Sequence, residues 1–450
     1  MKHISLFILL LSLGSCGLYT PYKQTNTVPD NLYGVTSQDT SSIADMSWRE
    51  ILSDQNLQVL IDSALKNNTD LKIARLRIDQ AKATLMTSKL AYAPSLSLGA
   101  DGTISSFDGS AASKIYSVPV SASWEIDFWG RLLNAKRKSQ AALIQSEDFA
   151  QAVQTELIAN LSNLYFTLLM LDAQHAVAIE TEAKWKESVE VAMAMKEAGI
   201  YTEAAVAQTE ANYYNICTSI KDLKEQINTV ENSINSIIAE TPQTIQRGKL
   251  RELKLPTDLS IGIPLQLLHK RPDVRSAEQN LAQYFYSVGE ARSAFYPSIR
   301  IGGSAGWTNS AGGYIVNPGK VLLSAIGSLT QPLFNKGQNV ARLKIAKSQY
   351  EAAQLQFHQT LLNAGVEVNN AFTQLETAKS KKELYSKQIE SLKRAVESTQ
   401  LLMEHGSTNY LEVLTAEQTL LSARFAQISN IYNEARASIF LYQALGGGTY

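Results

Sequence analysis

Two stretches of the chain alternate between apolar and polar residues, which predicts two β-hairpins, over residues 95–128 and 298–334. The returning half of the first hairpin shows the pattern most clearly, because every second residue from 116 to 128 is apolar. Side chains of a strand point alternately to its two faces. One face therefore carries Tyr116, Val118, Val120, Ala122, Trp124, Ile126 and Phe128, and the other carries Ser117, Pro119, Ser121, Ser123, Glu125 and Asp127.

Strands of about ten residues with one apolar and one small polar face are typical of a transmembrane β-barrel. A sheet that exposes one face to water gives the same alternation. The barrel is favoured because the chain begins with a secretory signal and because its polar faces carry Ser and Gly rather than Lys and Glu. Pro119 fits poorly, since it cannot donate a hydrogen bond to a neighbouring strand.

Most of the remaining chain has helical periodicity, in four long segments at residues 132–198, 203–239, 338–405 and 410–445. At ~1.5 Å per residue, the longest segments would extend on the order of 100 Å. Helices of that length need packing partners throughout. Leucines at alternating spacings of four and three favour coiled-coil packing, namely Leu157, Leu161, Leu164, Leu168 and Leu171.

The order of predicted elements occurs twice, which indicates an internal duplication. A helix runs through a proline into a strand at Pro94 and again at Pro297, 203 residues later. The helix break at Gly199 recurs at Gly406, 207 residues later. Small changes in loop length after a duplication account for the increase in this offset from 203 to 207 residues. We expect a first repeat at residues 48–263 and a second at residues 264–450.

The N-terminus predicts export and a lipid anchor. A lysine precedes an apolar run, and small residues then lead to Cys16, so residues 1–15 resemble the signal peptide of a bacterial lipoprotein. Cys16 would be acylated, and residues 16–47 would form an extended tether. The alternative is an ordinary signal peptide that is cleaved elsewhere. Gly17 favours sorting to the outer membrane, by the same resemblance.

Composition gives no indication of an enzyme or a nucleic-acid partner. The formal net charge is −1, and no apolar run approaches the ~20 residues of a transmembrane helix. The five histidines show no metal-ligand spacing, and there is no phosphate loop or nucleophile elbow. We expect no catalytic activity, no metal site, and no cofactor apart from the lipid on Cys16.

One copy of the chain offers only two hairpins, which cannot close a barrel. Open sheet edges do not occur in the hydrocarbon region of a bilayer, because their backbone groups would lack hydrogen bonds. Several copies must therefore complete the barrel together. The expected fold is an α+β membrane protein in which four strands of each protomer join those of its neighbours and long helices pack into a tube.

Three segments of the chain carry a family resemblance, namely residues 268–278 (LHKRPDVRSAE), residues 289–298 (GEARSAFYPS) and residues 445–448 (LGGG). They resemble the outer membrane factor family, the outer-membrane lipoproteins of tripartite efflux pumps. The resemblance covers essentially the whole mature chain. It implies a homotrimeric channel-tunnel in the outer membrane, with a twelve-stranded β-barrel and an α-helical barrel extending into the periplasm. It also implies two partners, a periplasmic adaptor and an inner-membrane pump of the RND type.

The family resemblance assigns the two helix breaks to the periplasmic end of the tunnel. Gating or selectivity is expected at Glu412, supported by Thr408, Asn409, Tyr410 and Thr415, since a ring of carboxylates attracts cations. Relatives can carry charged residues at positions 408 and 415, so threonine there is a departure. The alternative for Glu412 is a solvated helix charge. Adaptor docking is expected at Gly199, Ile200, Tyr201, Thr202, Gly406 and Ser407.

The predicted function is a passive exit duct for small toxic compounds or drugs. A duct of the same family could instead export protein or metal ions. A third hypothesis, from another class, is a lipid-tethered periplasmic coiled-coil scaffold without a barrel, against which the alternation from Tyr116 to Phe128 argues. The sequence identifies neither the substrates nor the partner pump.

Overall fold

A computed structural model describes residues 19–24, 32–33, 42–253, 267–308, 320–405, 408 and 410–448. The signal peptide, Cys16 and most of the predicted tether lie outside these residues. The chain divides into two compact units, and each unit takes segments from both sequence repeats. Unit 1 comprises residues 1–25, 76–148 and 275–360; unit 2 comprises residues 26–75, 149–274 and 361–450. Within the described residues, no helix is long and apolar enough to span a bilayer.

Three pairs of helices have equal lengths in the two halves of the chain. They are α4 (Thr69–Leu90) and α8 (Pro272–Ser293), with 22 residues each; α5 (Arg131–Glu197) and α9 (Gln338–Glu404), with 67 each; and α6 (Glu203–Ile237) and α10 (Tyr410–Ala444), with 35 each. The first pair begins 203 residues apart and the other two begin 207 residues apart. These are the two offsets found in the sequence. The short helices are α2 (Trp48–Ile51), α3 (Gln55–Asn67) and α7 (Leu267–Lys270), with 3-10 turns η2 (Ile43–Asp45) and η3 (Leu250–Glu252).

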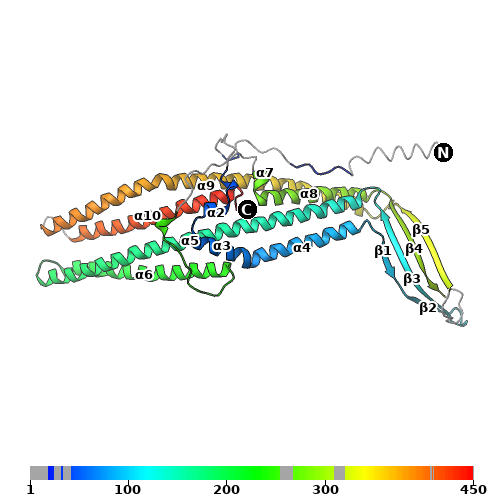
Figure 1. Cartoon of the computed structure of the whole chain (residues 1–450), viewed down its shortest axis with the longest axis horizontal. Helices are drawn as coiled ribbons and strands as arrows, with labels where there is room; N and C mark the ends of the chain where they lie inside the picture. Colours follow the sequence, from blue (N-terminus) through cyan, green and yellow to red (C-terminus); the bar gives the residue numbers. More distant parts are fainter. Residues whose placement is uncertain are drawn as a thin grey trace. The chain divides into compact units, whose positions relative to one another are not determined.

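Unit 1 contains one antiparallel sheet in which the two hairpins lie side by side (Figure 1). β1 (Ser95–Leu98) and β2 (Asp101–Ser105) both pair with β3 (Ser113–Ile126). β3 also pairs with β4 (Ser298–Thr308), which in turn pairs with β5 (Lys320–Thr330). β1 and β2 pair with β3 in the same continuous register, so together they occupy one strand position, which we call the β1–β2 line. The five strands therefore fill four strand positions of the sheet.

Pro119 explains why the first line is divided into β1 and β2, where the sequence predicted one strand. Strand pairing with β3 is interrupted at Gly99 and Ala100, opposite the part of β3 that contains Pro119. Proline has no N–H to donate to a neighbouring strand. The Gly99 amide still donates to the Pro119 carbonyl at 3.0 Å. On the other side Pro119 faces Gly306, where an added Cβ would lie 2.5 Å from the Pro119 Cα. Glycine on both sides thus accommodates the proline.

The register places most apolar residues of the sheet on one face, although some, such as Ile115 and Ile326, lie on the other. Trp124 of β3 is opposite Ile301 of β4, which is opposite Gly327 of β5. Two residues along, Ile126, Ile299 and Leu329 form the next row. The other face has rows of small or polar residues, such as Ser121, Ser304 and Ser324. The alternation predicted for β3 therefore extends across the hairpins as two chemically distinct faces.

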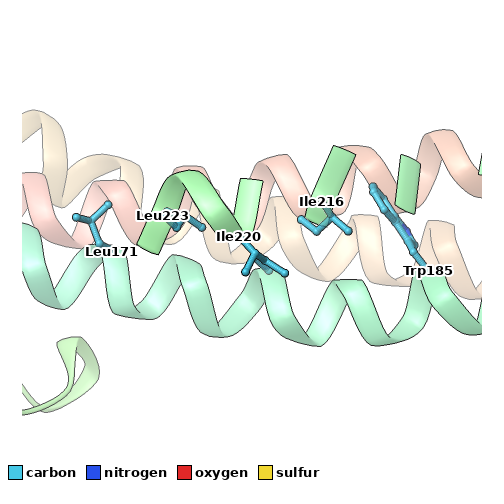
Figure 2. Packing of buried hydrophobic residues seen from close by; sticks show 6 residues of the cluster. Leu171, Trp185, Ile216, Ile220 and Leu223 are labelled. Atoms are coloured by element: carbon cyan, nitrogen blue, oxygen red, sulfur yellow. The ribbon is translucent and has the colours of Figure 1, made fainter. Parts of the chain in front are cut away.

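Unit 2 has an apolar core between α5 and α6. Leu171, Ala178 and Trp185 on α5 are buried and lie seven residues apart, which continues the leucine spacing found in the sequence. They pack against Ile216, Ile220 and Leu223 of α6, and Figure 2 shows these side chains directed into the space between the two helices. Spacings of three, four and seven place residues on one helical face. The seam is therefore a helix–helix interface.

A buried arginine joins three segments of unit 2. The Arg271 guanidinium donates to both Asp273 carboxylate oxygens (3.0 and 2.6 Å), to Glu367 of α9 (2.7 Å) and to the carbonyl of Ala444 at the end of α10 (2.8 Å). An added Cβ at Gly446 would lie 2.6 Å from the Lys270 carbonyl carbon. The RPD and GGG motifs are thus parts of one packing arrangement.

We predict that Arg271→Met destabilises the folded protein by about 2–3 kcal/mol. Removing one partner of a buried ion pair costs about 3–5 kcal/mol, but Asp273 and Glu367 keep side-chain exposures of 44% and 43% and can be partly hydrated. Guanidinium unfolding of the detergent-solubilised protein measures the change. The exposed Arg394→Met is the control and should shift stability by less than about 0.5 kcal/mol. Equal losses of stability in the two variants would contradict the role of Arg271 in joining these segments.

Candidate functional site

The break between α5 and α6 combines a helix C-cap with a helix N-cap. Gly199 has a φ of +73°, which residues with a Cβ rarely adopt. The amides of Gly199 and Ile200 donate to carbonyls of the last turn of α5 at 2.9 and 2.8 Å, the hydrogen-bond pattern of a Schellman motif. The Thr202 hydroxyl then accepts the Ala205 amide at 3.3 Å and caps α6. These contacts reverse the chain between two long helices.

An apolar groove of 810 Å³ lies beside this break, between the α5–α6 connection and the start of α10. We call it the tip groove. The Tyr201 hydroxyl donates to Met403 Sδ at 3.1 Å, and its ring lies 5.2 Å from that of Tyr410. Ile200 and Leu411 line the groove with 66% and 59% of their surface exposed. The groove therefore presents apolar surface that this protomer does not cover.

The residues expected to dock an adaptor are only partly brought together. Ile200, Tyr201 and Thr202 line the tip groove. Gly199 shapes the break instead of lining the groove. Gly406 and Ser407 lie outside the described residues.

The residues expected at the gate divide between the tip groove and an exposed face of α10. Thr408 and Tyr410 line the groove. Glu412 and Thr415 are exposed and lie three residues apart, hence on one face of α10. The Thr415 hydroxyl donates to the Leu411 carbonyl at 2.8 Å. Asn409 lies outside the described residues.

The buried hydroxyls of Thr408 and Tyr410 have no hydrogen-bond partner within the described part of the chain. Burial raises the pKa of the Tyr410 hydroxyl. Ser188 and Thr209 lie beside it, but they donate to carbonyls of their own helices, at 3.0 and 2.8 Å. Buried polar groups are usually paired, so these two hydroxyls are exceptions beside the start of α10.

Glu417 connects three helices of unit 2 and was not identified from the sequence. Its carboxylate on α10 accepts the indole N–H of Trp185 on α5 at 3.1 Å and the amide N–H of Gln400 on α9 at 3.4 Å. Burial raises the pKa of Glu417, against the effect of the two donors and of Lys184. Continuing the leucine spacing beyond Leu171 would have found Trp185, whereas no sequence pattern marks Glu417 as its partner.

A second ionic connection between α5 and α10 lies close by. Arg424 on α10 donates to the Glu180 carboxylate on α5 at 2.7 Å. The hydrogen bond from Arg424 lowers the pKa of Glu180 to about 2, and Lys184 adds to the effect. Together with Glu417, these residues line a groove of 540 Å³ between α5, α9 and α10. These polar contacts join α5 and α10 beside Leu421 and Phe425 of α10, which pack against the core between α5 and α6.

We predict that Glu417→Gln stabilises the protein at pH 7, by up to about 1 kcal/mol, because glutamine keeps an acceptor but carries no charge to desolvate. The folded-state pKa of Glu417 lies above its ordinary value of 4.5. Its protonation therefore stabilises the wild type as pH falls through the folded pKa, and this contribution is complete below 4.5. The difference in stability between Glu417→Gln and the wild type should therefore be largest at pH 7 and vanish near pH 4.5.

Melting temperatures of both proteins across this range test the prediction. The exposed Glu225→Gln serves as the control and should show no such pH-dependent difference. A difference between wild type and Glu417→Gln that grows as the pH falls would contradict the raised pKa.

Comparison with known proteins connects this architecture to one family. The sequence model described as outer membrane efflux protein matches residues 60–240 and 263–447. The chain is 27% identical to the cation efflux system protein CusC of Escherichia coli, over 98% of each chain. It is 26% identical to SilC of Salmonella typhimurium, named "Probable outer membrane lipoprotein", over 100% of this chain and 99% of SilC.

Solved structures show the same fold. The outer-membrane channel OprN superposes with a TM-score of 0.88 at 26% identity and covers 96% of this chain and 100% of its own. The open state of the MtrE outer membrane channel of Neisseria gonorrhoeae gives a TM-score of 0.85 at 27% identity, with 96% and 98% covered. The chain therefore belongs to the outer membrane efflux protein family and serves as an exit duct in the outer membrane.

Proposed function

We propose that three copies of this chain assemble into one channel with a twelve-stranded β-barrel in the outer membrane and a helical tube in the periplasm. The observation that carries the proposal is the sheet of unit 1. Its one apolar face suits lipid and its small polar face suits a water-filled interior. Among the described strands, β5 and the β1–β2 line each pair on one side only. Such edges are not tolerated in lipid, so neighbouring protomers must pair with them.

The proposed cargo is small toxic organic compounds, which move passively through the duct. Several polar rows of the sheet carry small side chains such as Ser121 and Ser304, which leave space and offer few specific contacts. A second candidate is the export of metal cations, favoured by the 27% identity with a cation efflux system protein. In either case the driving force would come from a partner pump.

The proposed partners are a periplasmic adaptor and an inner-membrane pump of the RND type. The tip groove supports adaptor docking, because it is apolar, is open to solvent and lies at a helix break. Exposed apolar surface rimmed by polar residues is typical of a protein-binding site. A partner that places apolar side chains against Ile200 and Leu411 would cover it.

We also propose that Cys16 carries the lipid that anchors each protomer. The motif that ends at Cys16 supports this, as does similarity to a relative named as an outer membrane lipoprotein. A single acyl chain binds membranes only weakly. The barrel would supply the rest of the membrane attachment.

At the periplasmic end we propose that Glu412 lines the closed gate. Three copies would bring three carboxylates to one constriction, where they attract cations and repel each other. Its exposed position on the same face of α10 as Thr415 supports this role. We propose that Thr408, Asn409 and Tyr410 shape the break from which this face starts.

The first test is single-channel conductance in planar bilayers. Wild-type protein should give small, cation-selective currents. Glu412→Gln should lose at least half of the cation selectivity and conduct more, because the carboxylate ring is gone. The exposed Glu225→Gln on α6 is the matched control and should behave as wild type. Currents that Glu412→Gln leaves unchanged would remove Glu412 from the gate but keep the duct; a soluble monomer would reject the duct itself.

The second test addresses docking and cargo in cells that lack the native gene. Ile200→Glu should fail to restore resistance to organic toxicants, lowering the minimal inhibitory concentration at least fourfold, because a charge in the tip groove opposes apolar docking. Its single-channel conductance should remain that of wild type. Leu384→Glu, at an exposed apolar position of α9, is the control. Normal resistance with Ile200→Glu would exclude the tip groove as the adaptor-docking site. If the strain that lacks the gene is sensitive to metal salts but not to organic toxicants, cation export is favoured.

A further inference from the structure

Basic residues concentrate where the long helices leave the sheet of unit 1. Residues 131–138 at the start of α5 contain four basic and no acidic residues, and so do residues 336–347 around the start of α9. Beyond these starts, α5 carries nine acidic and three basic residues and α9 carries seven acidic and six basic. The whole chain has a net charge of only −1. The positive charge is therefore local, and we call this region the basic belt.

The basic belt lies next to the N-terminal segment of residues 19–24. Arg137 donates to the Tyr19 carbonyl at 2.9 Å, and the Tyr22 amide donates to the Tyr286 hydroxyl at 3.2 Å. A cavity of 130 Å³ is lined by Thr20 together with Arg292 and Lys347, with Glu351 as its acidic residue. Lys23, Arg292 and Lys347 are all exposed.

The N-terminal segment indicates which side of unit 1 meets the bilayer. Cys16 precedes Tyr19 by three residues, so it can lie no farther than about 10 Å from it along the chain. A lipid on Cys16 would thus enter the membrane beside Arg292 and Lys347. This step rests on the proposed lipid anchor.

Aromatic residues place the membrane interface at the same level. Trp129 stacks on Tyr296 with ring centroids 4.6 Å apart and meets Phe128 edge-on at 4.9 Å. Phe128 and Trp129 lie in the connection from β3 to α5, and Tyr296 lies in the connection from α8 to β4. Phe128 and Phe334 are exposed. Aromatic side chains collect at the boundary between hydrocarbon and headgroups. The basic belt begins two residues after Trp129 and two residues after Phe334, within reach of the headgroups.

We propose that Lys347 of the basic belt and the neighbouring exposed side chains Lys23 and Arg292 bind anionic phospholipid headgroups in the periplasmic leaflet of the outer membrane. Ammonium and guanidinium groups near an anionic surface are attracted over a distance of about one Debye length, ~8–10 Å. The surplus of acidic residues farther along α5 disfavours approach of the same lipids there. The belt would fix the depth of the barrel and add to the anchoring by the lipid on Cys16.

The test uses the full-length lipidated protein in vesicles that contain brominated phosphatidylglycerol or brominated phosphatidylethanolamine. Bromine quenches tryptophans of adjacent protein, and Trp124, Trp129 and Trp307 belong to unit 1. The wild type should be quenched preferentially by the anionic lipid. A triple variant, Lys23→Gln, Arg292→Gln and Lys347→Gln, should lose at least about fivefold of this preference. Raising the salt concentration should weaken the wild-type preference as well.

Two further proteins make the result specific. The matched control neutralises three exposed basic residues far along α9, Lys381, Lys387 and Arg394, and should keep the wild-type preference. A charge-preserving variant, Lys23→Arg, Arg292→Lys and Lys347→Arg, should also keep it, which a purely structural role would not require. Circular dichroism verifies that each variant is folded.

No wild-type preference, or an equal loss in the α9 control, would overturn the proposal. Flotation with the vesicles is measured on the same samples. If the protein floats with the vesicles but shows no lipid preference, only the proposed binding of anionic headgroups is rejected. Protein that fails to float would reject the membrane-embedded sheet on which the proposed function depends.

Discussion

Backbone hydrogen bonding at the sheet edges is the constraint on which the rest of this protein depends. The β1–β2 line and β5 each have one side without a described partner strand, and the sheet has an apolar face suited to lipid. Water cannot satisfy edge groups inside a bilayer. A chain with this sheet must therefore find its missing partners in other copies of itself. Closure by several copies and the orientation of the polar face toward an interior both follow from that requirement.

Duplication solves the packing of the long helices. Helices in proteins gain most of their stability from packing, and each helix of 67 residues is followed by a partner of 35 residues. The α5–α6 interface uses an apolar seam centred on Trp185. The first and second helix pairs are also joined by polar contacts, through Glu417 and through the Glu180–Arg424 pair. Leu421 and Phe425 of α10 also pack against the α5–α6 core, so polar and apolar contacts together hold the two pairs.

The two helix breaks illustrate different uses of similar sequence. Gly199 makes a fully hydrogen-bonded C-cap, whereas the second break leaves the hydroxyls of Thr408 and Tyr410 unpartnered among the described residues. The groove between them is apolar and exposed at Ile200 and Leu411. A partner docked in the groove would lie against Thr408 and Tyr410, which gives a physical route from partner binding to the proposed gate.

The sequence by itself determined the strands, the long helices and the duplication, because period-two and seven-residue patterns are local and survive any tertiary arrangement. It also identified Gly199 as a break, since a left-handed residue favours glycine. Only the tertiary structure decided that Pro119 is tolerated between two glycines, that Arg271 bridges to Glu367 and the Ala444 carbonyl, and that Glu417 meets Trp185 and Gln400. These contacts join residues from different elements, and their cost or benefit depends on burial and distance, which no local pattern encodes.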